Sequence, residues 1–121
     1  MKRERKKKLL GSTYQVQTGC GKLYIIINED DDKIFEVFAS IGKAGGCATS
    51  QVEALGRVIS LGLRSGVEPK QIVRQLSSIS CHSPVIIGGE KILSCSDAIA
   101  KTLKSYLDEK EEKRINESKD I

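Results

Sequence analysis

The chain is 121 residues long, 39% of its residues are hydrophobic, and its formal net charge is +4. This length allows one domain with a modest core and leaves little room for a large enzyme pocket. No apolar stretch approaches the roughly 18 residues of a membrane-spanning helix, and none resembles the apolar core of a signal peptide. We therefore expect a cytoplasmic protein that does not cross a membrane.

The positive charge is concentrated near the N-terminus. Residues 2–8 read KRERKKK and carry a net charge of +5, which leaves the rest of the chain at −1. We interpret residues 1–11 as a basic arm that precedes the folded part. Its simplest role is that of a solvated segment, and the alternative is salt-sensitive binding of nucleic acid. The residues of that alternative are Lys2, Arg3, Arg5, Lys6, Lys7 and Lys8.

Three segments in the first third of the chain have the pattern of β-strands. Thr13–Thr18 and Ile34–Ser40 alternate polar and apolar residues, and Leu23–Asn28 is rich in β-branched and aromatic residues. A glycine-flanked turn joins the first two segments, and the acidic turn 29–33 joins the last two. The sequence predicts a three-stranded antiparallel meander.

Helical patterns follow the predicted sheet. Residues 49–50 offer hydroxyl caps for a helix that should end near Gly66, and Pro69 fits the first turn of a second, short helix. Two short apolar arms flank Gly88-Gly89 and indicate a hairpin, and residues 94–97 open a last helix. The predicted fold class is α+β, with the meander and the hairpin packed against two or three helices.

Composition divides the chain into three parts. Residues 1–11 are the arm, residues 12–107 are the domain, and residues 108–121 are charge-dense and poor in apolar residues. We interpret the last part as a charged C-terminal tail, either a fraying helix or a disordered segment.

Four cysteines are the most informative residues. Cys20, Cys47, Cys81 and Cys95 each lie at a predicted turn or element boundary, although no two form a CxxC pair. In a cytoplasmic protein such cysteines favour a metal site or thiol chemistry over structural disulfides. We expect one tetrahedral zinc, held by the four thiolates, that staples the meander to the later segments. The alternatives are four cysteines without a ligand and a redox pair drawn from the four.

The glycine-rich loop before the first helix has two interpretations. A strand, a GKAGG loop and a helix start are the general layout of an anion site, here formed by Lys43, Gly45, Gly46 and Thr49. The Walker spacing is absent, however, and glycines beside Cys47 also let that cysteine reach a metal. We prefer the second interpretation. The single histidine, His82, leaves no convincing hydrolytic triad.

Several motifs together resemble a known family. TGCGKLY, IGKAGGC and the later EALGR and LRSG segments, spread over residues 11–103, are similar to the TSCPD domain. That domain usually closes the adenosylcobalamin-dependent class of ribonucleotide reductase, which serves deoxyribonucleotide synthesis. The resemblance implies that the four cysteines are metal ligands. Residues 93–97 read LSCSD, so the threonine and proline of the name motif are replaced.

The resemblance also limits what we expect of the chain. The catalytic barrel of the reductase is missing from this sequence, and with it the cobalamin site and the active-site cysteines. We expect kinship with ribonucleoside-diphosphate reductase without catalysis by this chain alone. The leading hypothesis is a zinc-stabilised accessory module that binds a protein partner, a reductase or a related protein. A thiol–disulfide component of a reductase and a nucleic-acid-binding module are the rivals.

Overall fold

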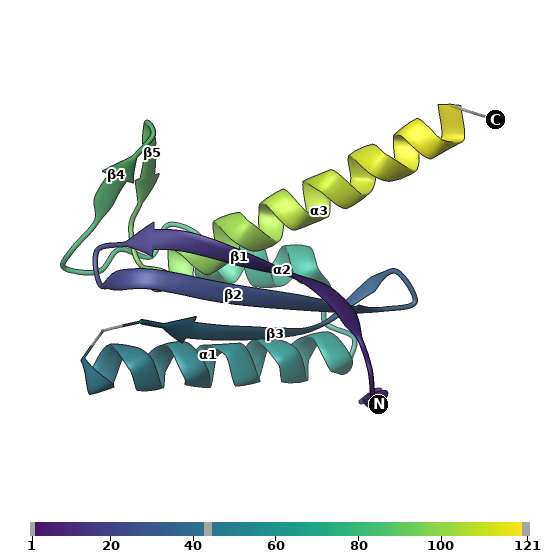
Figure 1. Cartoon of the computed structure of the whole chain (residues 1–121), viewed down its shortest axis with the longest axis horizontal. Coiled ribbons are helices and arrows are strands. Elements are labelled where there is room, and N and C mark those ends of the chain that lie inside the picture. Colours follow the sequence, from purple (N-terminus) through teal and green to yellow (C-terminus); the bar gives the residue numbers. More distant parts are fainter. Residues whose placement is uncertain (1, 43–44, 120–121) are drawn as a thin grey trace.

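The computed structural model describes residues 2–42 and 45–119. The fold is α+β, as predicted: a three-stranded antiparallel sheet, a two-stranded hairpin and three helices (Figure 1). In chain order the elements are β1 (Leu10–Thr18), β2 (Gly21–Asp30), β3 (Lys33–Ile41), α1 (Gly46–Arg64), α2 (Pro69–Leu76), β4 (Val85–Ile87), β5 (Glu90–Ile92) and α3 (Cys95–Lys119).

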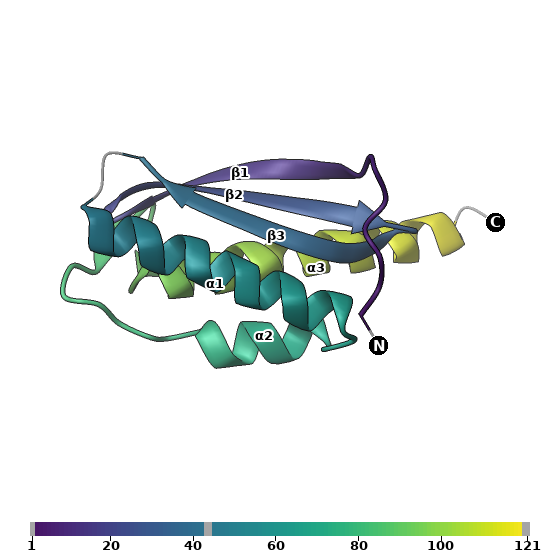
Figure 2. The ribbon, with the colours of Figure 1, turned by 90° about the horizontal axis from the view of Figure 1, so that it is seen from below.

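The sheet buries one face and exposes the other. Leu23, Ile25 and Ile27 alternate along β2, and none of the three is exposed to solvent. Ile99 and Leu103 of α3 pack into the same core cluster. All three helices lie on one side of the sheet (Figure 2), so its opposite face is left without a helical cover.

Helix α1 closes the edge of β3. β3 is an outer strand of the sheet, and an unprotected edge leaves backbone groups without partners. The Ser60 hydroxyl accepts a hydrogen bond from the Val37 N–H at 3.0 Å and donates one to the Val37 carbonyl at 2.9 Å. A Cβ added at Gly56 would lie 3.3 Å from the same carbonyl, so glycine permits the close approach. Ser60 of α1 therefore satisfies both backbone groups of one residue on the outer edge of β3.

The predicted turns and helix ends are largely confirmed. Asp31 and Asp32 both have positive φ in the tight β2–β3 turn, as does Gly66 after α1, and Pro69 opens α2. The predicted cap at residues 49–50 is wrong, because α1 begins at Gly46 with Gly45 as its N-cap. The glycine-rich loop thus enters the helix one turn earlier than the hydroxyl residues suggested.

The charge-dense C-terminal segment continues α3 through Lys119. Charged pairs one turn apart support this extension, as between Lys104 and Asp108. Among residues 2–42 and 45–119, no helix is long and apolar enough to cross a membrane.

Candidate functional site

Three of the four cysteines come together from distant parts of the chain. Cys20 lies in the β1–β2 turn, Cys81 in the loop after α2, and Cys95 is the first residue of α3; all three are half-buried free thiols. Burial raises the pKa of the Cys20 thiol, and the neighbouring thiols of Cys95 and Cys81 raise it further. The structure thus creates a cluster of sulfur atoms at one end of the sheet.

The β1–β2 turn is shaped to bring Cys20 against this cluster. The Thr18 hydroxyl donates to the Gly21 carbonyl at 2.8 Å and accepts from the Cys20 N–H at 3.2 Å. Gly19 packs so tightly that an added Cβ would lie 1.7 Å from the carbonyl oxygen of Ser83. Glycine at 19 is therefore required for the turn to meet the segment that carries Cys81.

Cys81 is held beside Cys95 by backbone and side-chain hydrogen bonds. The Cys81 N–H donates to the Leu93 carbonyl at 2.9 Å, just before α3 begins. The Ser83 N–H donates to the Cys81 sulfur at 3.3 Å, and the Thr18 hydroxyl lies 3.7 Å from the Cys95 sulfur. The Ser83 N–H is a donor of the kind that stabilises a thiolate and orients it as a ligand. The Thr18 hydroxyl gives its one hydrogen to the Gly21 carbonyl, so toward Cys95 it acts as an acceptor.

A buried carboxylate organises the start of α3. Ser94 accepts from the Asp97 N–H at 3.0 Å as an N-cap residue does, and its own hydroxyl donates to the Ile79 carbonyl. The Asp97 carboxylate accepts from the N–H groups of Ser78 and Leu93 and pairs with Lys101. Burial alone would raise the pKa of Asp97, but these partners together lower it below the ordinary value.

Cys47 stands apart from the other three. It is exposed in the first turn of α1. Gln51, four residues later on the same helical face, lines a hollow that Cys95 also lines. Within the residues that the structure describes, no group of three or more His, Cys, Asp or Glu side chains is arranged to hold a metal ion. The four-cysteine staple is not confirmed and stays a prediction.

The other predicted anion residues lie around the start of α1. Gly45 and Gly46 are its N-cap and first residue, and Lys43 lies outside the described residues. The Thr49 hydroxyl donates to the Gly45 carbonyl at 3.1 Å, so it already has a partner within the helix. Anion binding at this loop stays a prediction.

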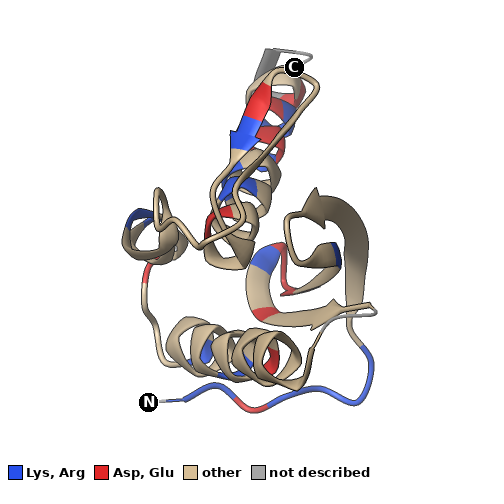
Figure 3. Ribbon diagram, turned by 90° about the vertical axis from the view of Figure 1, so that its left-hand side faces the viewer, with Lys and Arg blue, Asp and Glu red and all other residues tan. Residues whose placement is uncertain are grey.

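The basic arm lies against the folded domain (Figure 3). Arg5 forms an ion pair at 2.7 Å with Glu36, whose side chain is only 3% exposed. Arg3 and Arg64 each place a guanidinium 5.0 Å from the centre of the Phe35 ring. Lys6 pairs with Asp30 at 2.6 Å. Three of the six cations proposed for nucleic-acid binding thus contact the folded domain, whereas Lys2, Lys7 and Lys8 form no ion pair among the described residues.

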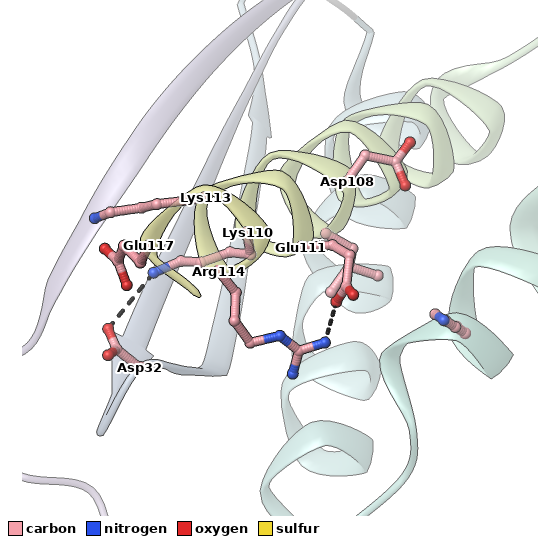
Figure 4. Close-up of a pocket in the computed structure, with 9 residues that line it drawn as sticks. Asp32, Asp108, Lys110, Glu111, Lys113, Arg114 and Glu117 are labelled. Carbon is pink, nitrogen blue, oxygen red and sulfur yellow. Dashed lines mark hydrogen bonds and ion pairs between the residues drawn. The ribbon is translucent and has the colours of Figure 1, made fainter. Parts of the chain in front are cut away.

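A charged hollow of about 370 Å³ lies between α3 and the β2–β3 turn, away from the cysteines (Figure 4). Two of its four cations are paired: Lys110 contacts Glu29 at 2.9 Å and Asp32 at 3.6 Å, and Arg114 contacts Glu111. The Tyr106 hydroxyl also donates to Glu29. The contacts of Lys110 and Tyr106 hold α3 against the end of β2 and the β2–β3 turn, whereas the Arg114–Glu111 pair lies within α3.

Sequence reasoning missed the residues that place the sulfur atoms. The sequence did predict that residues 94–97 open the last helix, and the spacing of Ser94 and Asp97 is that of a capping box. Nothing in the sequence indicated that Asp97 would bond the N–H of Ser78 or that Gly19 would touch Ser83, because these contacts join segments far apart in the chain.

Comparison with known proteins identifies the family of the chain. A family model described as the TSCPD domain matches residues 1–107, which is most of the chain and contains all four cysteines. No curated protein and no solved structure gives a significant match. The chain therefore belongs to the TSCPD-domain family and is related, through that domain, to the ribonucleotide reductases in which it is found.

Proposed function

We propose that this chain is a zinc-stabilised accessory module that binds a protein partner, a ribonucleotide reductase or a relative of one. The observation that carries the proposal is the gathering of Cys20, Cys81 and Cys95 from three separate segments. A divalent cation that binds such a cluster takes the place of the thiol protons, and its binding free energy adds to the stability of the fold.

The chemistry of the donors fits zinc. Thiolates are the preferred ligands of structural zinc, and a closed site takes four of them. The Ser83 N–H already donates to the Cys81 sulfur, as outer partners of metal ligands do.

The fourth ligand in this proposal is Cys47. It precedes Gln51 by one helical turn, and Gln51 shares a hollow with Cys95. One turn corresponds to about 5 Å along the helix axis, so a local shift of the first turn of α1 would carry Cys47 toward the cluster. When bound, zinc would supply a cross-link among the β1–β2 turn, the loop after α2 and the first turns of α1 and α3.

The redox alternative is disfavoured at Cys20. Attack on a disulfide requires a thiolate, and reactive cysteines have lowered pKa values. The pKa of Cys20 is raised, first by burial and then by Cys95 and Cys81. Its thiol would stay protonated and unreactive near neutral pH. A reducing, cytoplasmic location would suit four free thiols of this kind.

Metal analysis of the protein purified with a thiol reductant and zinc tests the proposal. We expect one zinc per chain, and we expect a chelator to lower the thermal midpoint because metal binding contributes folding free energy. Replacement of any one of Cys20, Cys47, Cys81 and Cys95 by alanine should abolish stoichiometric zinc, whereas the matched control His82→Ala should retain it. Metal-free protein of equal stability with four reactive thiols would refute the site.

The partner is tested separately by co-sedimentation with a ribonucleotide reductase catalytic subunit. We expect a complex with the zinc-loaded wild-type protein and none after chelation. Zinc binding without any such complex would leave the site intact and refute the accessory role.

A further inference from the structure

The face of the sheet opposite the helices carries exposed apolar side chains. Tyr24, Ile26 and Phe38 are 38%, 36% and 49% exposed, respectively. They alternate with the buried residues of β2 and β3, and all helices lie on the other side (Figure 2). Large apolar side chains grouped on a solvent-facing sheet are typical of a binding surface.

Each of the two aromatic residues borders its own hollow, and each hollow also contains a cation. Tyr24 and Lys22 line a hollow of about 460 Å³ near the start of β2. Phe38 and Arg57 line a second hollow of about 350 Å³, between β3 and α1. An aromatic ring beside a cation, found twice on one face, suits a ligand that repeats a flat ring and an anionic group.

The sheet register places the two aromatic residues as neighbours. Phe38 lies opposite Ile26 on the adjacent strand, and Tyr24 is two residues from Ile26 on β2. Tyr24 and Phe38 are therefore diagonal neighbours, a relation in which Cα atoms are about 7–8 Å apart and long side chains can still reach each other. Two consecutive rings of an extended ligand can stack on two such side chains.

The charges of this face favour an anionic ligand. Glu36 on the same face is buried and bound to Arg5, so it does not repel anions. Glu53 pairs with Arg57 at 3.0 Å, but both side chains are mostly exposed, and a pair of this kind is weak enough for a phosphate to displace. Lys22 has no carboxylate partner among the described residues.

We propose that the outer face of the sheet binds single-stranded nucleic acid, with successive bases stacked on Tyr24 and Phe38 and backbone phosphates held by Lys22 and Arg57. Aromatic stacking selects unpaired bases, because the bases of a duplex are already stacked and paired. The proposal does not depend on the zinc site. It also moves nucleic-acid binding away from the arm, where Arg3, Arg5 and Lys6 contact the protein itself.

Fluorescence anisotropy with a labelled oligothymidylate of about 12 nucleotides tests the proposal. We expect wild-type protein to bind the single strand and the double variant Tyr24→Ser, Phe38→Ser to bind at least about 10-fold more weakly. A Lys22→Ala, Arg57→Ala variant should reduce the slope of log affinity against log salt by about 1.4, since each phosphate contact contributes about 0.7 for single strands. The control variant Val58→Ser, Leu61→Ser, which removes exposed apolar residues from α1, should bind as the wild type does.

Several outcomes would overturn the proposal. These are no binding by the folded wild-type protein, equal affinity for a duplex of the same sequence, and unchanged binding by the aromatic double variant. Loss of binding on replacing only Lys7 and Lys8 would return the site to the arm. Sedimentation that shows a dimer dissolved by the aromatic variant, without oligonucleotide binding, would assign the face to self-association. Circular dichroism of each variant verifies that it is folded.

Discussion

The carboxylate of Asp97 accepts a hydrogen bond at 2.9 Å from the backbone N–H of Ser78, nineteen residues earlier in the chain. Ser78 has a positive φ of 66°, and Asp97 is 1% exposed. The bond ties the segment after α2 to the first turn of α3. Because Cys81 follows Ser78 and Cys95 precedes Asp97, this contact helps to hold the two cysteines together, as do the Cys81–Leu93 and Ser94–Ile79 bonds.

Replacing Asp97 by asparagine should therefore disturb both stability and the cysteine cluster. The asparagine amide has only one acceptor oxygen, so one of the N–H groups of Ser78 and Leu93 would lose its partner. We expect a loss of about 1–3 kcal/mol in the free energy of unfolding, measured by urea denaturation. Alkylation of Cys81 should become faster in the metal-free protein. Asp108→Asn on the exposed part of α3 is the matched control, and an equal loss there would contradict the assignment.

Low pH should destabilise the protein because the buried carboxylates of Asp97 and Glu36 become protonated. Burial would raise the pKa of Glu36, but hydrogen bonds from Arg5 and Asn28 and the nearby positive charges together lower it, and the pKa of Asp97 is lowered likewise. Carboxyls with lowered pKa values stabilise the fold above their unfolded pKa, and this stability is lost as the pH falls through the folded pKa. We expect the free energy of unfolding to decline as the pH drops below about 4. Asp97→Asn should make the free energy of unfolding less dependent on pH in this range. An unchanged pH dependence in this variant would contradict the role of Asp97.

The edge contact between α1 and β3 should depend on one hydroxyl. Ser60→Ala leaves the N–H and carbonyl of Val37 without their partner at a half-buried position. The expected cost is about 1–3 kcal/mol by urea denaturation, whereas Ser105→Ala on the exposed side of α3 should change stability little. Gly56→Val should destabilise the same contact through its close approach to the backbone of β3. Equal stability of Ser60→Ala and Ser105→Ala would show that α1 does not need this bond.

The arm should stabilise the domain through Arg5. Arg5→Ala removes the cation from a carboxylate that is almost fully buried, and an unpaired buried charge is unfavourable. We expect the thermal midpoint to fall by several degrees at neutral pH and the pKa of Glu36 to rise. Lys7→Ala removes a neighbouring exposed charge and should have no such effect. If both variants have the thermal midpoint of the wild type, the arm is a solvated segment that does not stabilise the domain.

The strands, turns and helix starts could be predicted from the sequence because they depend on residues close together in the chain. Alternation along β2, paired positive-φ residues in the β2–β3 turn and Pro69 at the start of α2 each follow from local sterics and burial. The start of α1 was harder to predict, since its N-cap Gly45 has no side-chain hydroxyl to mark the position. The family resemblance rested on the same local motifs and holds over residues 1–107.

The tertiary structure alone decided which residues meet. That Cys20, Cys81 and Cys95 gather while Cys47 stays exposed depends on the Asp97–Ser78 bond and on the Gly19–Ser83 contact, neither of which has a local signature. The same holds for Arg5 on Glu36 and for the open sheet face with Tyr24 and Phe38. Sequence by itself determined which residues can ligate, cap or stack, because that is a property of each side chain. Which groups these side chains contact depends on the tertiary packing, because that packing brings segments far apart in the chain side by side.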